Sequence, residues 1–202
     1  MVNYTGKKVT IFGGGKVGAR KARYFADEAD VTVYSRSFNS DFQTIPVKQI
    51  KKDVSREDSN LSTLIEGASL VIAATSDPVL NSSILTSCKR QGILCNNATE
   101  PPGDVSLPAK FTGEQFTIAV STRGGSPAVA RFIREHIQAT WPNLDQMIIL
   151  EDQLRSDLKE QGIPEDRRRE ILTAVLHDPE IWQALKTGLP EANRLVAQRY
   201  QS

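Results

Sequence analysis

Short apolar runs alternate with helical patterns along the first half of the chain. In residues 17–28 the apolar side chains recur on one helical face, whereas residues 69–74 are almost continuously apolar. Continuous apolarity is typical of a strand buried on both faces of a parallel sheet. The predicted strands are 8–12, 30–34, 45–47, 69–74 and 93–96, and the predicted helices are 17–28, 61–66 and 78–91. This alternation predicts an α/β fold with a doubly wound parallel sheet.

The pattern changes near Pro108. Residues 116–120 form one more strand-like run, and Pro127 after the N-cap residue Ser126 begins a helix. From Asn143 onward every pattern is helical, with predicted helices at 144–161, 164–176, 178–185 and 190–200. We therefore expect a doubly wound domain over residues 1–112, a small α+β segment over 113–142 and an all-helical C-terminal domain over 143–202.

A glycine-rich stretch joins the first predicted strand to the first predicted helix. Gly13, Gly15 and Gly18 occupy the three glycine positions of the GxGxxG fingerprint. The first glycine permits a tight turn, the second lets the backbone approach a diphosphate, and the third lets the helix pack close to the strand. Since the stretch follows a strand and opens a helix, we expect a Rossmann-type dinucleotide site with the diphosphate at the helix N-terminus.

The end of the second strand leaves the choice of nucleotide open. A Rossmann unit that binds NAD usually has Asp or Glu at this position for the ribose hydroxyls, but here the residues are Ser35, Arg36 and Ser37. Arg36 could receive the 2′-phosphate of NADP. Alternatively, Arg36 and Ser37 fold over the adenosine of either nucleotide.

Two later segments follow strands that end at the same edge of the sheet. Thr75 and Asp77 should face the cofactor cleft, although Asp77 before Pro78 is equally suited to capping the next helix. The segment 97–104 contains Glu100 and Asp104, which could supply an acid or a base to a substrate. The alternative for that segment is a turn-rich connector with exposed acids.

A second loop of small residues spans 121–127 and precedes the helix at Pro127. Arg123 lies in this loop, and Arg131 and Arg134 are three residues apart on the helix. Three arginines at a helix N-terminus suit a polyanionic ligand. In the alternative interpretation they only solvate the helix, whose apolar stripe forms a subunit contact.

Composition restricts the class of protein further. A net charge of +1 over 202 residues gives no reason to expect nucleic acid as the main partner. Apolar runs such as 70–74 are far shorter than the ~20 residues of a membrane span. Cys88 and Cys95 lack metal-site spacing, so we expect two reduced, partly buried thiols, no metal and a cytoplasmic location.

Taken together, four motifs resemble those of one enzyme family. They are residues 13–21, residues 73–77 with Asn81, the pair Cys95 and Asn96, and residues 126–131. In this order they resemble the precorrin-2 dehydrogenase family, also found within siroheme synthases. The resemblance covers residues from about 5 to 140 well and the helical tail more loosely.

The resemblance implies a specific reaction. Members of this family oxidise precorrin-2 to sirohydrochlorin with NAD⁺ in siroheme biosynthesis, form homodimers through the middle segment, and some also insert Fe²⁺. By matching motif positions, the cofactor contacts fall on Lys16, Val17, Arg36 and Ser37, and the resemblance favours NAD over NADP. Because precorrin-2 carries many carboxylates, basic side chains are the candidates to hold it, namely Lys110, Arg123, Arg131 and Arg134.

One position departs from the family pattern. Where the family shows an aspartate proposed as its acid/base and chelatase residue, this chain has Thr99. Either Glu100 or Asp104 takes over the proton, or the function of that carboxylate is absent. This departure makes ferrochelatase activity the least expected of the family's activities. It also leaves open an alternative function, a module that senses a dinucleotide without catalysing a reaction.

Overall fold

The computed structural model describes residues 2–55, 60–123 and 125–200, and the chain divides into two compact units. The first unit is Met1–Leu107 and the second is Pro108–Ser202. The predicted division at residues 112 and 142 stays a prediction. Among the described residues, no helix combines the length and the apolar character needed to cross a bilayer.

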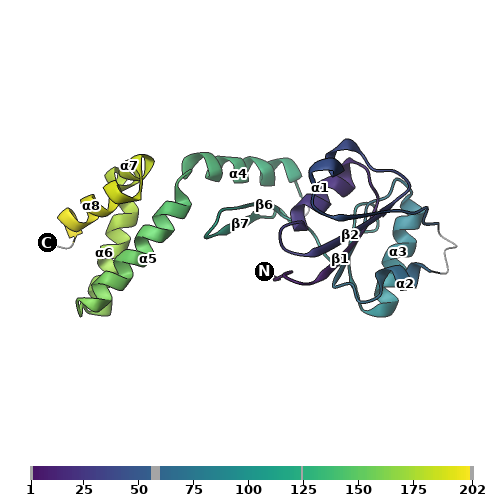
Figure 1. Cartoon of the computed structure of the whole chain (residues 1–202), viewed down its shortest axis with the longest axis horizontal. Coiled ribbons are helices and arrows are strands. Elements are labelled where there is room, and N and C mark those ends of the chain that lie inside the picture. The colour runs from purple at the N-terminus through teal and green to yellow at the C-terminus, as the bar shows by residue number, and fades with distance from the viewer. Residues whose placement is uncertain (1, 56–59, 124, 201–202) are drawn as a thin grey trace. The chain divides into compact units, whose positions relative to one another are not determined.

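The first unit is built on a five-stranded parallel sheet, as the sequence predicted (Figure 1). Its strand order is β3-β2-β1-β4-β5. In register, Val9 of β1 lies between Val31 of β2 and Leu70 of β4. The strands are β1 Lys8–Phe12, β2 Asp30–Ser35, β3 Lys48–Lys51, β4 Leu70–Ala73 and β5 Leu94–Asn97.

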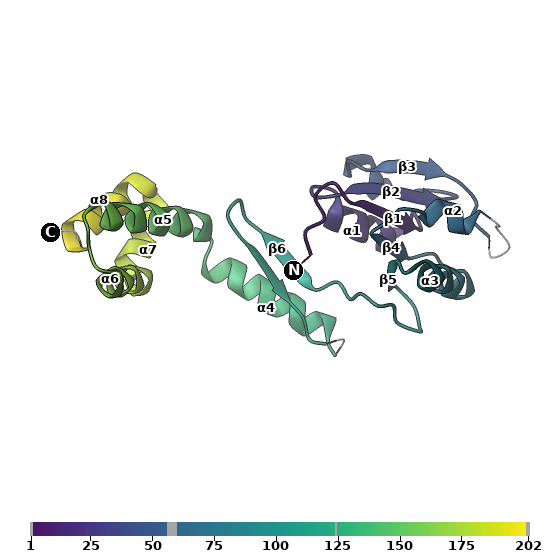
Figure 2. The same cartoon turned by 90° about the horizontal axis from the view of Figure 1, so that it is seen from below.

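Helices cover both faces of this sheet. Leu70 and Ile72 of β4 pack in one buried cluster with Phe25 of α1, while Val71 and Ala73 pack in another with side chains of α2 and α3. All four residues of β4 are buried, which explains its continuous apolar run. The helices are α1 Lys16–Phe25, the short 3₁₀ helix η1 Ser40–Thr44, α2 Leu61–Ile65 and α3 Pro78–Gln91. Figure 2 shows the same strands with α1 and α3 on opposite sides.

Two strands differ from the prediction. The predicted strand at 45–47 is wrong, because β3 begins only at Lys48, directly after the predicted strand ends, and pairs there with Thr32 of β2. Pro46 lacks the N–H that a strand would donate, and its neighbours form a tight turn in which Val47 N donates to Ile45 O at 2.8 Å. In addition, β6 Ala109–Thr112 was not predicted.

The second unit combines a hairpin, a helix and a helical bundle. Strands β6 and β7 Thr117–Val120 pair antiparallel, and α4 Pro127–Thr140 packs against both. Buried residues such as Leu150, Val175 and Ile181 form a single cluster in the bundle. The bundle helices are α5 Leu144–Glu160, α6 Glu165–His177, α7 Pro179–Thr187 and α8 Leu189–Tyr200, close to the predicted ranges.

Candidate dinucleotide site

The turn between β1 and α1 requires glycine at three positions. Gly13 has φ +117°, and a Cβ there would lie 2.2 Å from the carbonyl oxygen of Ala74 on β4's exit. A Cβ on Gly14 would lie 2.2 Å from the carbonyl oxygen of Ser37, and one on Gly18 would lie 1.9 Å from that of Gly13. The loop is therefore pressed against the ends of β2 and β4. Gly14 was not among the predicted site residues, although it belongs to the same run of glycines.

Gly15 differs from these glycines because its missing side chain faces open space. A Cβ there would meet no atom within 4 Å, and its backbone is extended, with φ −81° and ψ −173°. It occupies the N-cap position of α1 without any side-chain cap. The N–H groups of the first turn, from Lys16 and Val17 onward, point away from the helix and have no intrahelical acceptor. This end of α1 fits the diphosphate of a dinucleotide, because free N–H groups and the helix dipole both favour an anion.

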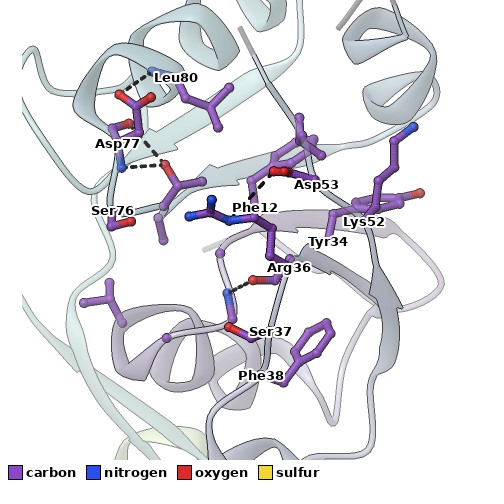
Figure 3. Close-up of a pocket in the computed structure, with 18 of the residues that line it drawn as sticks. Phe12, Tyr34, Arg36, Ser37, Phe38, Lys52, Asp53, Ser76, Asp77 and Leu80 are labelled. Carbon is purple, nitrogen blue, oxygen red and sulfur yellow. Dashed lines mark hydrogen bonds and ion pairs between the residues drawn. The ribbon is translucent and has the colours of Figure 1, made fainter.

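A cavity of about 780 Å³ opens in front of this loop (Figure 3). That volume is typical of small-molecule and cofactor sites. Its wall is formed by the glycine loop and the segments that follow β2, β3 and β4, all at the carboxyl edge of the sheet, where ligands of such sheets bind. Among the predicted cofactor residues, Gly13, Gly15, Lys16, Val17, Arg36, Ser37, Thr75 and Asp77 line this cavity. Gly18 does not, since it is buried under the loop.

The exit of β2 carries a charge arrangement that the sequence did not reveal. Arg36 Nε lies 3.8 Å from Asp53 Oδ1, and both side chains are 72% exposed. In Figure 3 a dashed line joins the two side chains. Asp53 follows β3, so the misplaced strand at 45–47 hid its position. The end of β2 lacks an acid of its own, but the segment that follows β3 places a carboxylate beside Arg36.

Thr75 and Asp77 at the exit of β4 are held by hydrogen bonds. Asp77 caps α3, because its Oδ1 accepts from Val79 N at 2.9 Å and from Leu80 N at 3.2 Å. Thr75 Oγ1 donates to Asn81 Oδ1 at 2.7 Å. Asp77 therefore combines the two roles that the sequence left open, as it caps the helix and also lines the cavity.

The two predicted acid/base candidates lie outside this cavity wall. The chain reverses its direction after β5, which brings Asp104 back beside that strand. There the Asp104 Oδ2 accepts a hydrogen bond from Cys95 N at 3.3 Å. Glu100 is exposed. Thr99, between them and β5, hydrogen-bonds through its hydroxyl to Asn97 Oδ1 at 3.1 Å. The structure does not bring Glu100 and Asp104 to the glycine loop, and their catalytic role stays a prediction.

The basic residues predicted to hold the substrate all lie in the second unit. Arg131 Nε and Arg134 Nη2 both bind Glu135 Oε1, each at 2.8 Å, so one carboxylate gathers the two guanidinium groups. Arg123 has φ +53°, a left-handed conformation that favours glycine. Lys110 lies on β6.

A half-buried lysine on α1 was also missed by sequence reasoning. Lys21 Nζ donates to Asn96 Oδ1 on β5, and the same amide donates to Val105 O at 2.5 Å. Burial, together with the nearby Arg20, lowers the pKa of Lys21 to about 8. No sequence pattern in the helix that follows the glycine loop indicates that Lys21 contacts Asn96. Cys88 and Cys95 are both buried free thiols.

Comparisons with known proteins agree with this geometry. A family model described as NAD(P)-binding matches residues 1–109. The chain is 37% identical to a precorrin-2 dehydrogenase from Methanosarcina barkeri, over 98% of this chain and 89% of the relative. It is 30% identical to a siroheme synthase from Stutzerimonas stutzeri over 98% of this chain, which spans only 43% of that longer protein.

The fold also matches a solved structure. The structure titled SirC, precorrin-2 dehydrogenase, superimposes with a TM-score of 0.69 at 21% identity and covers 98% of both chains. At that identity the structural match establishes only the fold, whereas the relatives found by sequence establish the family. This chain belongs to the precorrin-2 dehydrogenase family, with an NAD(P)-binding domain at its N-terminal end.

Proposed function

We propose that this protein oxidises precorrin-2 to sirohydrochlorin with NAD⁺, with the nucleotide bound in the glycine-loop cavity. The observation that carries the proposal is the open space at Gly15 beside the uncapped N-terminus of α1, in a chain of this family. The reaction removes two hydrogens from the substrate, one as a hydride and one as a proton. When bound, NAD⁺ supplies the hydride acceptor.

The chain's own residues orient the nucleotide. The first-turn N–H groups at Lys16 and Val17 bind the diphosphate, and Gly13 and Gly18 hold the loop in the shape that exposes them. Arg36 and Ser37 cover the adenosine end, with Asp53 opposite Arg36. Thr75 and Asp77 lie along the wall that follows β4. Fixing the reactive ring against one carbon of the substrate is the main contribution such a site makes to the rate.

The proton acceptor is assigned to the segment after β5. Asp104 is our first candidate, because its carboxylate is held by the backbone of Cys95, and Glu100 is the second. The variants Asp104→Asn, Glu100→Gln and Thr99→Ala separate the alternatives. The one that removes the base should lower kcat on the order of a hundredfold with little change in NAD⁺ affinity. If all three turn over like the parent, no side chain of this segment accepts the proton.

The substrate's carboxylates are assigned to the basic residues of the second unit, Lys110, Arg123, Arg131 and Arg134. Guanidinium groups bind carboxylates through two parallel hydrogen bonds. Glu135 holds Arg131 and Arg134 close together, so the three side chains form one group with a net charge of +1.

Helix α4 carries an apolar face suited to a second copy of the chain. Val129, Phe132 and Ile133 are 48%, 68% and 37% exposed, and Ala130 is the buried residue of that helix. Burying such side chains against a second α4 is favourable. We propose a homodimer, and the free thiols Cys88 and Cys95 support a reducing, cytoplasmic location.

The decisive experiment mixes the purified protein with precorrin-2 and NAD⁺ and follows the absorbance of sirohydrochlorin. NAD⁺-dependent turnover is expected. The second candidate function is a dinucleotide-sensing module, and the observation that favours it is Thr99 at the family's aspartate position. Tight NAD⁺ binding without turnover would support this second candidate. Because Thr99 replaces the carboxylate proposed for the family's chelatase step, ferrochelatase activity needs its own test. An assay of Fe²⁺ insertion into sirohydrochlorin provides it.

A further inference from the structure

A buried amide joins the two loops that leave β4 and β5. Asn81 on α3 is 0% exposed and lies directly behind Thr75, which lines the cavity. Its Oδ1 accepts from Thr75 N at 3.0 Å and from Thr75 Oγ1 at 2.7 Å. Its Nδ2 donates to Thr75 O at 3.1 Å, so Asn81 bonds the backbone of Thr75 through both of its polar groups.

The same amide reaches the next loop along the sheet. Asn81 Nδ2 also donates to Thr99 Oγ1 at 3.4 Å, and that hydroxyl donates to Asn97 Oδ1 at 3.1 Å. Asn97 Nδ2 then donates to Pro101 O at 2.7 Å. These bonds use both acceptor positions and both donor hydrogens of Asn81, so a single rotamer satisfies the whole network.

We propose that Asn81 is a positioning residue for the dehydrogenation, because its buried amide fixes Thr75 in the cofactor cavity and ties it to Thr99 in the loop after β5. This inference rests on the proposed function. Asn81 itself touches neither nucleotide nor substrate and acts through the two threonines. An amide suits this role because it donates and accepts at once without carrying a charge into the core.

The test measures NAD⁺ binding to the full-length protein by calorimetry, with Asn81→Ala compared with Cys88→Ala. Cys88 is equally buried on the same helix, but its thiol faces that of Cys95 and it is not part of the cavity lining. Asn81→Ala should weaken NAD⁺ binding about tenfold, because Thr75 loses three hydrogen bonds that orient it, two of its backbone and one of its hydroxyl. Cys88→Ala should bind NAD⁺ like the parent, although both changes lower the melting temperature.

A double-mutant cycle distinguishes positioning from general loosening. Thr75→Val removes only the hydroxyl bond and keeps the two backbone bonds to Asn81, so it should weaken NAD⁺ binding less than Asn81→Ala does. Because both changes remove the same hydroxyl bond, the double variant should lose less affinity than the sum of the two separate losses. Thr99→Val should leave the Kd for NAD⁺ unchanged and lower kcat. This division between the two threonines remains measurable even if Asn81→Ala does not fold.

Three outcomes would overturn the inference. They are equal NAD⁺ affinities for Asn81→Ala and Cys88→Ala, fully additive effects of Asn81→Ala and Thr75→Val, or an unchanged NAD⁺ affinity in Thr75→Val. If the parent binds NAD⁺ but does not oxidise precorrin-2, the proposed function fails, and the binding comparisons still decide whether Asn81 positions the cavity wall.

Discussion

A Cβ atom on Gly18 would lie 1.9 Å from the carbonyl oxygen of Gly13. That distance is shorter than any real contact of this kind, so α1 can approach the turn only because residue 18 has no side chain. We expect Gly18→Ala to destabilise the first unit by about 1–3 kcal/mol, as an overpacked core does. Urea unfolding followed by the circular dichroism of the purified variant measures this loss.

Gly15→Val is the matched opposite case. The extended backbone and the open space at Gly15 accommodate valine without a clash, so the unfolding midpoint should fall only slightly, since valine is a poorer N-cap residue than glycine. The same side chain fills the approach to the α1 N-terminus, and NAD⁺ affinity should fall on the order of a hundredfold through lost charge-assisted hydrogen bonds. A Gly15→Val variant that folds and binds NAD⁺ with the parent's Kd contradicts the assignment of the diphosphate site.

The ion pair between Arg36 and Asp53 predicts a preference between nucleotides. Asp53 repels the 2′-phosphate of NADP and occupies Arg36, the side chain best placed to receive it. Asp53→Ser should therefore strengthen NADP⁺ binding relative to NAD⁺ by about fivefold, a modest effect because the pair is exposed. Paired calorimetric titrations with NAD⁺ and NADP⁺ measure the ratio. Asp41→Ser, in η1 and not part of the cavity lining, is the control and should leave the ratio unchanged.

The sheet of the first unit could be predicted because a strand that is buried on both faces has a continuous run of apolar residues. Residues 70–73 are apolar without interruption because successive side chains enter different cores. The glycine fingerprint likewise predicted the turn, since its three glycines stand at a recognisable spacing directly after a strand. The helix at Pro78–Gln91 was predicted to the residue, because Asp77 and Gly92 mark its ends.

The remaining features depend on contacts distant in sequence. Asn81 meets Thr99 and Lys21 meets Asn96 only after the sheet has formed, and no local pattern records either pair. Asp53 was missed because the strand before it, Lys48–Lys51, could not be recognised from the sequence. That strand is short and polar, lies at the edge of the sheet and has only one partly buried residue. Such strands carry little hydrophobic periodicity. The sequence could therefore place the cavity but not the network behind its wall.

Asp178 secures the C-terminal helices to one another. Its Oδ1 accepts from Glu180 N at 2.8 Å and caps α7, while its Oδ2 binds Arg199 Nη1 at 2.9 Å and Tyr200 Oη at 3.0 Å, both on α8. We expect Asp178→Ala to destabilise the helical bundle by about 2 kcal/mol, since it removes the cap and two further bonds. Urea titration measures the loss. Asp166→Ala, which breaks an exposed pair with Arg169, should cost no more than about 0.5 kcal/mol. Equal losses in the two variants would refute the role of Asp178.

Glu151 on α5 predicts how the stability of the second unit depends on pH. Burial raises the pKa of its carboxyl from about 4.5 to about 7, more than the nearby Arg155 lowers it, and Oε1 is buried without a hydrogen-bond partner. The folded state therefore holds this proton more tightly than the unfolded state does, so the associated stability is complete below pH 4.5 and is lost as the pH rises to about 7.

Replacing the carboxyl by an amide removes this titration. The melting temperature of Glu151→Gln, relative to the parent, should accordingly be higher at pH 8 than at pH 5. Thermal unfolding at both pH values measures the difference, and Asp152→Asn, an exposed neighbour on the same helix, serves as the control. A constant difference between Glu151→Gln and the parent from pH 5 to pH 8 would show that Glu151 is ionised throughout, so that burial does not hold its proton.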